Sequence, residues 1–125
     1  LCSDAALRRA GEAYEVAGDP TEGALVVAAE KAGIAVEAAR RATPRLDAIP
    51  FESEHQFMAV LHRGVAGLEV VVKGAPEVVL ARCADTDAGE VLAEARAEAE
   101  RLAARGMRVL AVASRPWAGG RASLE

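Results

Sequence analysis

The sequence has few aromatic residues, few cysteines and very few lysines. Four of its 125 residues are aromatic against thirty alanines, so the core must be packed from small side chains. The two cysteines form neither a CxxC pair nor a metal-site spacing, and a reducing cytosol is the expected compartment. The net charge is −4 and no run of basic residues is present, which argues against a nucleic-acid partner.

Several functional motifs are also missing. No two glycines stand two residues apart, which excludes a GxGxxG loop, and no Walker A loop or HExxH pair is present. No uncharged apolar run approaches the roughly 20 residues of a membrane span, and no leader is expected. We therefore expect no metal site and no catalytic residues of the chain's own, which disfavours a free-standing hydrolase.

What remains is the composition of one globular domain. Hydrophobic residues make up 52% and charged residues 27% of the chain, a balance that excludes global disorder. The length allows a single core. We expect one domain over residues 1–115 and a frayed polar tail over 116–125, whose final Leu124-Glu125 could be a cloning scar.

Capping signals predict the helices of the first half. Asp19 suits the N-cap, Pro20 the first helical position, and Glu22 the third, where its carboxylate can accept a bond from the N–H of the cap. Gly33 is a natural C-terminal stop. The expected elements are a helix over 4–13, an extended segment over 14–17, a helix over 20–33 and a short helix over 36–42.

Beyond Pro44 the spacing of the apolar residues becomes that of strands. Strands are expected over 46–51, 57–62, 68–73 and 107–114, with helices from Pro76 and over 90–105. The last helix is predicted by a stripe of Val91, Leu92, Ala95, Ala99 and Leu102. Because most strands follow one another through hairpins, the predicted fold class is α+β, an antiparallel sheet flanked by helices.

Lys73 and Gly74, at the end of a valine-rich strand, form the first candidate site. Thirteen of the fifteen basic residues are arginine, so a lysine here stands out. A compact ammonium beside a glycine suits a place where a ligand approaches the backbone closely. The alternative is a solvated strand end followed by a turn glycine.

Phe51, directly after Pro50 and before a polar stretch, is the second candidate. An aromatic ring exposed at a strand end can stack on a nucleobase. Taken alone, the residue pattern favours the alternative, in which Phe51 is one of the few large core side chains.

Glu22 and Arg108 complete the candidates. Glu22 can accept a hydrogen bond from an exocyclic amine, although the capping box alone accounts for a glutamate there. Arg108, expected on the last strand among apolar neighbours, could meet a phosphate or face outward from an amphipathic strand.

Four segments, in order along the chain, carry a family resemblance: GDPTEGAL (18–25), IPFESEHQFM (49–58), KGAPE (73–77) and GMRVLAVA (106–113). Together they resemble the nucleotide-binding (N) domain of P-type cation-transporting ATPases, over about residues 1–115. The likeness is closest to the calcium-pump-like branch, because the heavy-metal branch carries a His-Pro pair in this domain and neither histidine here precedes proline.

The resemblance implies a cytoplasmic domain of an integral membrane pump that binds ATP as Mg-ATP. Carried over by position, Phe51 would stack on adenine and Glu22 would accept a bond from its amino group, directly or through water. Lys73 and Gly74 would form the pocket floor, and Met58 would pack nearby.

In the same family Arg108 would reach the phosphates, and the γ-phosphate would pass to an aspartate in a separate phosphorylation domain. That aspartate lies in a DKTG motif, which this chain lacks, so the fragment should not turn over alone. The implied partners are the phosphorylation and actuator domains, with no direct membrane contact by this chain.

One position departs from the family pattern. Gln56 stands where several relatives carry a lysine, which makes any phosphate contact there neutral and weaker. Together with the acidic balance, it leaves open an N-domain-like interaction or regulatory module that binds no nucleotide.

Overall fold

The computed structural model describes residues 1–83, 89–119 and 123–124, and this part of the chain forms an α+β fold. Its main sheet is antiparallel, with spatial order β3 (Arg45–Glu52), β4 (Phe57–Gly64), β5 (Gly67–Gly74) and β6 (Ala111–Pro116). The predicted antiparallel sheet flanked by helices is confirmed.

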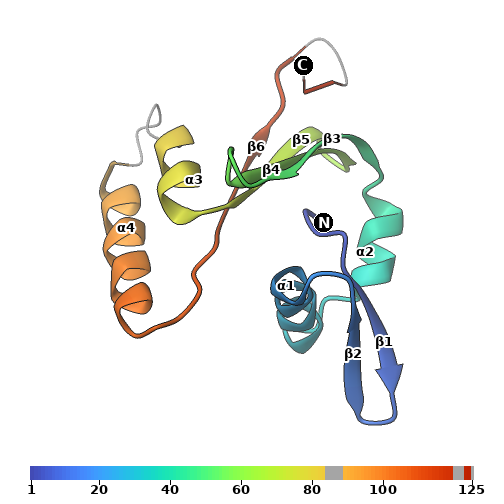
Figure 1. Cartoon of the computed structure of the whole chain (residues 1–125). Coiled ribbons are helices and arrows are strands. Elements are labelled where there is room, and N and C mark those ends of the chain that lie inside the picture. Colours follow the sequence, from blue (N-terminus) through green and yellow to red (C-terminus); the bar gives the residue numbers. More distant parts are fainter. Residues whose placement is uncertain (84–88, 120–122, 125) are drawn as a thin grey trace.

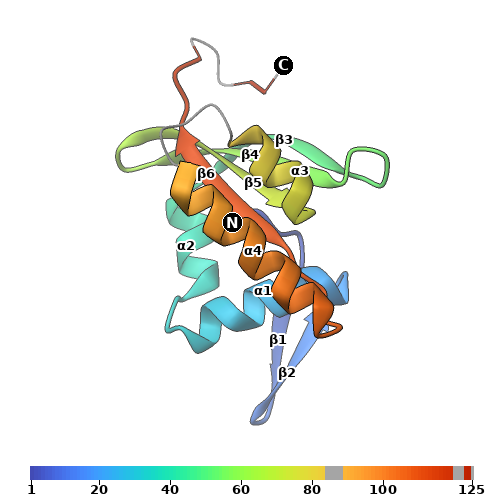
Figure 2. The same ribbon diagram turned by 90° about the vertical axis from the view of Figure 1, so that its left-hand side faces the viewer.

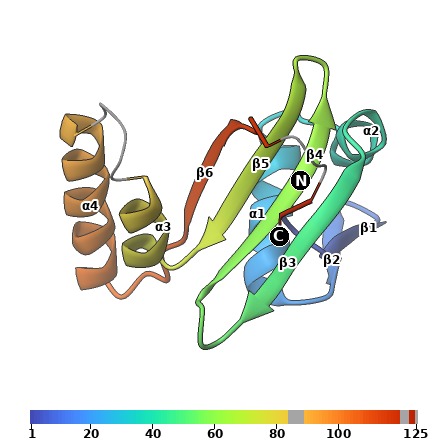
Figure 3. The same ribbon diagram turned by 90° about the horizontal axis from the view of Figure 1, so that it is seen from above.

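Helices lie on one face of this sheet and beyond one of its edges (Figure 1). Helices α1 (Pro20–Lys31) and α2 (Val36–Ala42) lie on one face (Figure 1), and Trp117 and Leu124 pack on the other. Helices α3 (Pro76–Arg82) and α4 (Gly89–Ala104) lie beyond β6, with α4 outermost (Figures 2 and 3). One face of the sheet therefore meets α1, which positions the site described below.

The helix expected over residues 4–13 is wrong. Strands β1 (Ala6–Ala10) and β2 (Ala13–Ala17) form a two-stranded antiparallel hairpin there, and only the extended segment over 14–17 is as predicted. Gly11 takes the first central position of the two-residue turn with φ +66°, the sign that hairpin turns of types I′ and II′ require. Local alanine and arginine favour a helix, but pairing with β2 overrides that preference.

Helix α1 begins as predicted, with one difference at its cap. The Oδ1 atom of Asp19 accepts bonds from the N–H groups of Thr21 at 2.8 Å and Glu22 at 3.1 Å. The Glu22 carboxylate does not complete a capping box, because both of its oxygens bind elsewhere. The helix ends just before Gly33, which has φ +82°.

Strand β4 is the centre of the core, because both of its faces are covered. On the face toward α1, Met58 and Val60 pack with Cys2. On the other face, Ala59 and Leu61 pack with residues that include Val70, Trp117 and Leu124.

Part of the expected tail thus contacts the sheet. The Trp117 N–H also donates to the Leu68 carbonyl at 2.8 Å. The division of the chain at residue 115 stays a prediction, and positions 120–122 and 125 of the tail lie outside the described residues.

The expected C-terminal helix and strand are both present, but the burial of the helix and the start of the strand differ from the prediction. Helix α4 is present, but none of its residues is buried and Val91, in the predicted stripe, is 65% exposed. Strand β6 begins at Ala111, so the strand predicted from Met107 starts four residues too early. In the described part of the chain we find no helix with the length and apolarity to cross a membrane.

Candidate functional site

A cleft of about 460 Å³ opens between the start of α1 and the α1-facing side of the main sheet. Its walls come from four separate stretches of sequence. The residues singled out above that line it are Glu22, Phe51, Met58, Lys73, Gly74 and Arg108. The fold therefore gathers into one cleft every residue that the family resemblance implied.

Phe51 reaches this cleft through an irregularity in β3. Ile49 pairs with Ala59, whereas Glu52 pairs with Phe57, so β3 contains one extra residue between them. A bulge of this kind interrupts the alternation of side chains and re-aims one of them. Ile49 accordingly packs on the far face of the sheet, while Phe51 lines the cleft and is 56% exposed. The interpretation of Phe51 as a core side chain is wrong.

Lys73 and Glu22 form an ion pair on the cleft floor. The Lys73 Nζ atom donates to Glu22 Oε1 at 2.5 Å, and the two side chains are only 5% and 18% exposed. Lys73 is therefore not a solvated strand end. Buried charges in proteins need partners of this kind, and the pair joins α1 to β5 across the cleft.

Gly74 is required by the backbone beside it. A Cβ atom at this position would stand 2.2 Å from the Gln56 carbonyl oxygen and 2.7 Å from the Phe57 Cα. The missing side chain leaves room for the backbone at the start of β4, and Gly74 also lines the cleft. Gln56 itself has φ +55°, and its carbonyl accepts a bond from Ala75 N–H at 3.0 Å.

Arg108 lies in the extended segment before β6, not on the strand as expected. It is exposed, and its Nη1 donates to the Thr21 hydroxyl at 3.1 Å. Asp19 lies near enough to feel its charge: the pKa of Asp19 is lowered by bonds from the N–H groups of Glu22 and Thr21, with a smaller effect of Arg108. Arg108 is thus a cation at the mouth of the cleft.

Five further residues line the cleft that sequence reasoning did not assign to a site: Asp4, Asp19, Thr21, Pro50 and Leu110. Asp19 and Thr21 are adjacent to Glu22 in the capping motif, so that motif was a usable signal. No sequence signal marks Asp4, because it enters the wall only through the path of the N-terminal segment.

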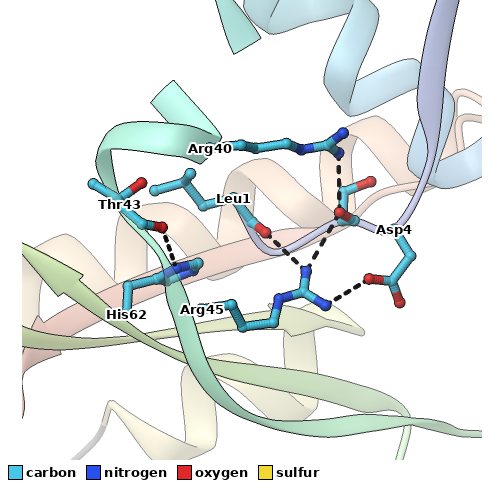
Figure 4. A pocket seen from close by; sticks show the side chains of 7 residues that line it. Leu1, Asp4, Arg40, Thr43, Arg45 and His62 are labelled. Carbon is cyan, nitrogen blue, oxygen red and sulfur yellow. Dashed lines mark hydrogen bonds and ion pairs between the residues drawn. The ribbon is translucent and has the colours of Figure 1, made fainter. Parts of the chain in front are cut away.

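A smaller cavity of about 270 Å³ lies beside this segment, between α2 and the edge of the sheet (Figure 4). His62 contributes to its wall and is 3% exposed. The Nδ1 atom of His62 faces the Thr43 carbonyl at 3.3 Å and must carry the proton to donate there, while Nε2 is buried and has no hydrogen-bond partner among the described residues. Burial lowers the pKa of His62 below its usual range, and the bond to Thr43 opposes this only in part.

This burial predicts a stability that falls in mild acid. Because the folded pKa of His62 lies below the unfolded value, the unfolded chain binds the proton first as the pH drops. The contribution of His62 to the free energy of unfolding is present above about pH 6.5 and is lost progressively below it. The free energy of unfolding then changes by at most about 1.4 kcal/mol per pH unit. Denaturant unfolding across this range should show a shallower slope for His62→Gln. Equal slopes in the parent chain and in His62→Gln would contradict the prediction.

Comparison with known proteins identifies the class to which this fold and cleft belong. The family model described as P-type ATPase, cytoplasmic domain N, matches residues 1–122. The chain therefore belongs to this family, and the predicted resemblance is confirmed.

The relatives include complete transport ATPases. A cation-transporting ATPase, pma1, of Synechocystis is 44% identical over 121 residues, which cover 92% of this chain. A probable cation-transporting ATPase F of Mycobacterium tuberculosis is 43% identical over 94% of the chain, and a calcium-transporting ATPase of Bacillus subtilis 33% identical over 96%. The chain spans only 13% to 14% of the length of these proteins.

Proposed function

We propose that this chain binds ATP, as Mg-ATP, in the cleft between α1 and the main sheet. Within a P-type cation-transporting ATPase, it would present the γ-phosphate to an aspartate of a separate phosphorylation domain. One observation carries the proposal: an exposed aromatic ring, a buried acid–lysine pair and a cation at the mouth, from distant parts of the sequence, line a single cleft.

The part of the cleft proposed for adenine combines apolar surface with an ion pair. Phe51 offers a ring face at a site whose floor is the apolar side chain of Met58 and the pair Lys73–Glu22. Stacking on such a ring contributes about 1–3 kcal/mol per base. Each oxygen of the Glu22 carboxylate has two lone pairs, so it can accept a bond from an amine while it holds Lys73.

The phosphate end depends on Arg108. Three carboxylates line the cleft (Asp4, Asp19 and Glu22) against two cations (Lys73 and Arg108). Lys73 is already paired, which leaves Arg108 to meet the phosphates, and Mg²⁺ on the nucleotide offsets part of their charge. Binding should therefore be modest, with a dissociation constant between roughly millimolar and tens of micromolar.

No lining residue is placed as a nucleophile for the terminal phosphate in this scheme. The reaction then depends on the phosphorylation and actuator domains of the parent pump, and this fragment alone should show no turnover. Modest affinity suits a domain that must release its product in every cycle.

Calorimetric titration with Mg-ATP, together with the amide spectrum, tests the proposal. The signals of Glu22, Phe51, Lys73 and Gly74 are expected to move. Phe51→Ala should weaken binding by about 1–3 kcal/mol, or about five- to 150-fold, without unfolding the domain, because the ring is mostly exposed.

The matched control is Tyr14→Ala, an aromatic residue of β2 that is 44% exposed and does not line the cleft. It should bind Mg-ATP as the parent chain does. A folded chain that gives no heat and no shift at saturating nucleotide would instead support the alternative, an interaction module without a nucleotide.

A further inference from the structure

The Glu22 carboxylate is held from behind the cleft as well as from its floor. While Oε1 accepts from Lys73, Oε2 accepts from the backbone N–H of Asp4 at 3.1 Å. The Ser3 hydroxyl also donates to the Glu22 carbonyl oxygen at 3.4 Å. The orientation of the carboxylate therefore depends on where the segment of residues 1–5 runs.

Arg40 of α2 holds that segment from the opposite side. Its Nη2 atom donates to the Ser3 carbonyl at 3.1 Å (Figure 4) and to the Ala5 carbonyl at 2.7 Å. Ser3 and Ala5 are 6% and 0% exposed, so these carbonyls are not available to bulk water. Both bonds have a charged donor, which makes them stronger than bonds between neutral groups.

The decisive feature is that Arg40 and Glu22 bind the two ends of one peptide unit. The Ser3 carbonyl and the Asp4 N–H belong to the same peptide, which is trans, so the two groups point in opposite directions. A cation therefore bonds to the oxygen end and a carboxylate to the N–H end of a single dipole. Linked hydrogen bonds of this kind polarise one another, most of all away from water.

Arg45 supports the same segment from its outer side. It pairs with the Asp4 carboxylate at 2.6 Å and donates to the Leu1 carbonyl at 3.1 Å and, more weakly, to the Ser3 carbonyl at 3.5 Å (Figure 4). Neither arginine lines the nucleotide cleft. An effect of Arg40 on ligand binding would therefore act through the segment that it holds, whose Asp4 N–H bonds to Glu22 and whose Asp4 side chain lines the cleft.

We propose that Arg40 is a positioning residue of the nucleotide cleft, which holds the Glu22 carboxylate in the orientation that accepts the amine of adenine by fixing the Ser3–Asp4 peptide. This inference rests on the proposed function for its ligand. The coupling of Arg40 to Glu22 itself is a property of the nucleotide-free chain.

The first measurement uses no nucleotide. In the amide spectrum, Arg40→Gln is expected to shift the Asp4 amide proton upfield, because the bond to Glu22 weakens once the peptide loses the nearer of the two arginines at its carbonyl oxygen. Glu22→Gln should shift the same proton in the same direction. The matched control Arg41→Gln changes an exposed arginine of the same helix and should leave it in place.

The second measurement compares ATP with inosine triphosphate, which has a carbonyl oxygen in place of the adenine amine. Arg40→Gln is expected to weaken ATP binding about fivefold, as one misaligned hydrogen bond would, and to leave inosine triphosphate binding unchanged. Arg40→Lys keeps the charge and should restore part of the preference for ATP. Should Arg40→Gln fail to fold, Arg40→Lys still supplies both readouts.

The outcomes separate the two proposals. An unmoved Asp4 amide proton, or equal losses for ATP and inosine triphosphate, would overturn the positioning role of Arg40. If the parent chain binds no ATP, the proposed function fails, and the Asp4 shift alone then decides whether Arg40 orients Glu22.

Discussion

Replacing Lys73 with methionine is expected to lower the free energy of unfolding by about 3 kcal/mol near neutral pH. The change removes the ammonium 2.5 Å from Glu22 Oε1 and leaves a carboxylate that is only 18% exposed without its cation. Breaking a buried ion pair from one side costs about 3–5 kcal/mol, and the residual exposure of Glu22 places this case at the lower end. Urea unfolding followed by circular dichroism measures the difference.

Two further variants test whether the loss of stability comes from the ion pair. Lys31→Met removes the only other lysine, which is exposed in the last turn of α1, and should change stability little. Adding Glu22→Gln to Lys73→Met removes the unpaired carboxylate charge and should recover part of the lost free energy of unfolding. If Lys73→Met is as stable as Lys31→Met, the ion pair does not contribute as described.

The second large effect is expected for Gly74→Ala. The added Cβ would meet the Gln56 carbonyl oxygen at 2.2 Å and the Phe57 Cα at 2.7 Å. These are backbone atoms of the paired strand β4 and of the turn residue just before it, and the Ala75 N–H bond to Gln56 holds them in place, so they cannot rotate away as a side chain would. Overpacking costs about 1–3 kcal/mol and sometimes more, and a clash with backbone belongs at the upper end, about 3 kcal/mol.

Gly64→Ala is the matched control for this prediction. Gly64 lies at the other end of the same hairpin, and the nearest atom to the methyl group that alanine would add there is the Gly67 carbonyl oxygen at 3.7 Å, an ordinary contact. Thermal unfolding should separate the two variants clearly. Equal melting temperatures would mean that β4 can shift away from β5 at little cost.

These two changes also bear on the cleft. Gly74 and Lys73 pair with Phe57 and Met58 across the β4–β5 ladder, so a displaced β4 would move the floor beneath Phe51. A loss of Mg-ATP binding in Gly74→Ala is thus expected to accompany its loss of stability, whereas Phe51→Ala should lose binding alone.

Elements with local signals were predictable from the residues. The cap of Asp19 and Pro20 starts α1, Gly33 ends it, and the valine-rich β5 pairs with β4 as a hairpin. Capping bonds and side-chain alternation act over a few residues, so the pattern in the chain carries them directly. The candidate site residues were predictable too, because they stand within the short family motifs.

What the residues could not decide depended on contacts between distant segments. Residues 4–13 have the composition of a helix, yet pairing with β2 makes Ala6–Ala10 a strand. Whether Phe51 is buried or exposed depends on a bulge, which is defined only by the partner strand. Glycine is required at position 74 because the backbone of another segment packs against it, not because of its own backbone conformation.

Composition and short-range pattern by themselves predicted the α+β class and most of the element positions, and the family resemblance added the residues worth testing. Only the folded chain decided that Glu22 binds Lys73, 51 positions away, and that Arg40 reaches the same carboxylate through a peptide unit. The reason is physical: hydrogen bonds and ion pairs require atoms within about 3 Å, and separation along the chain does not set that distance until the strands have paired and the core has closed.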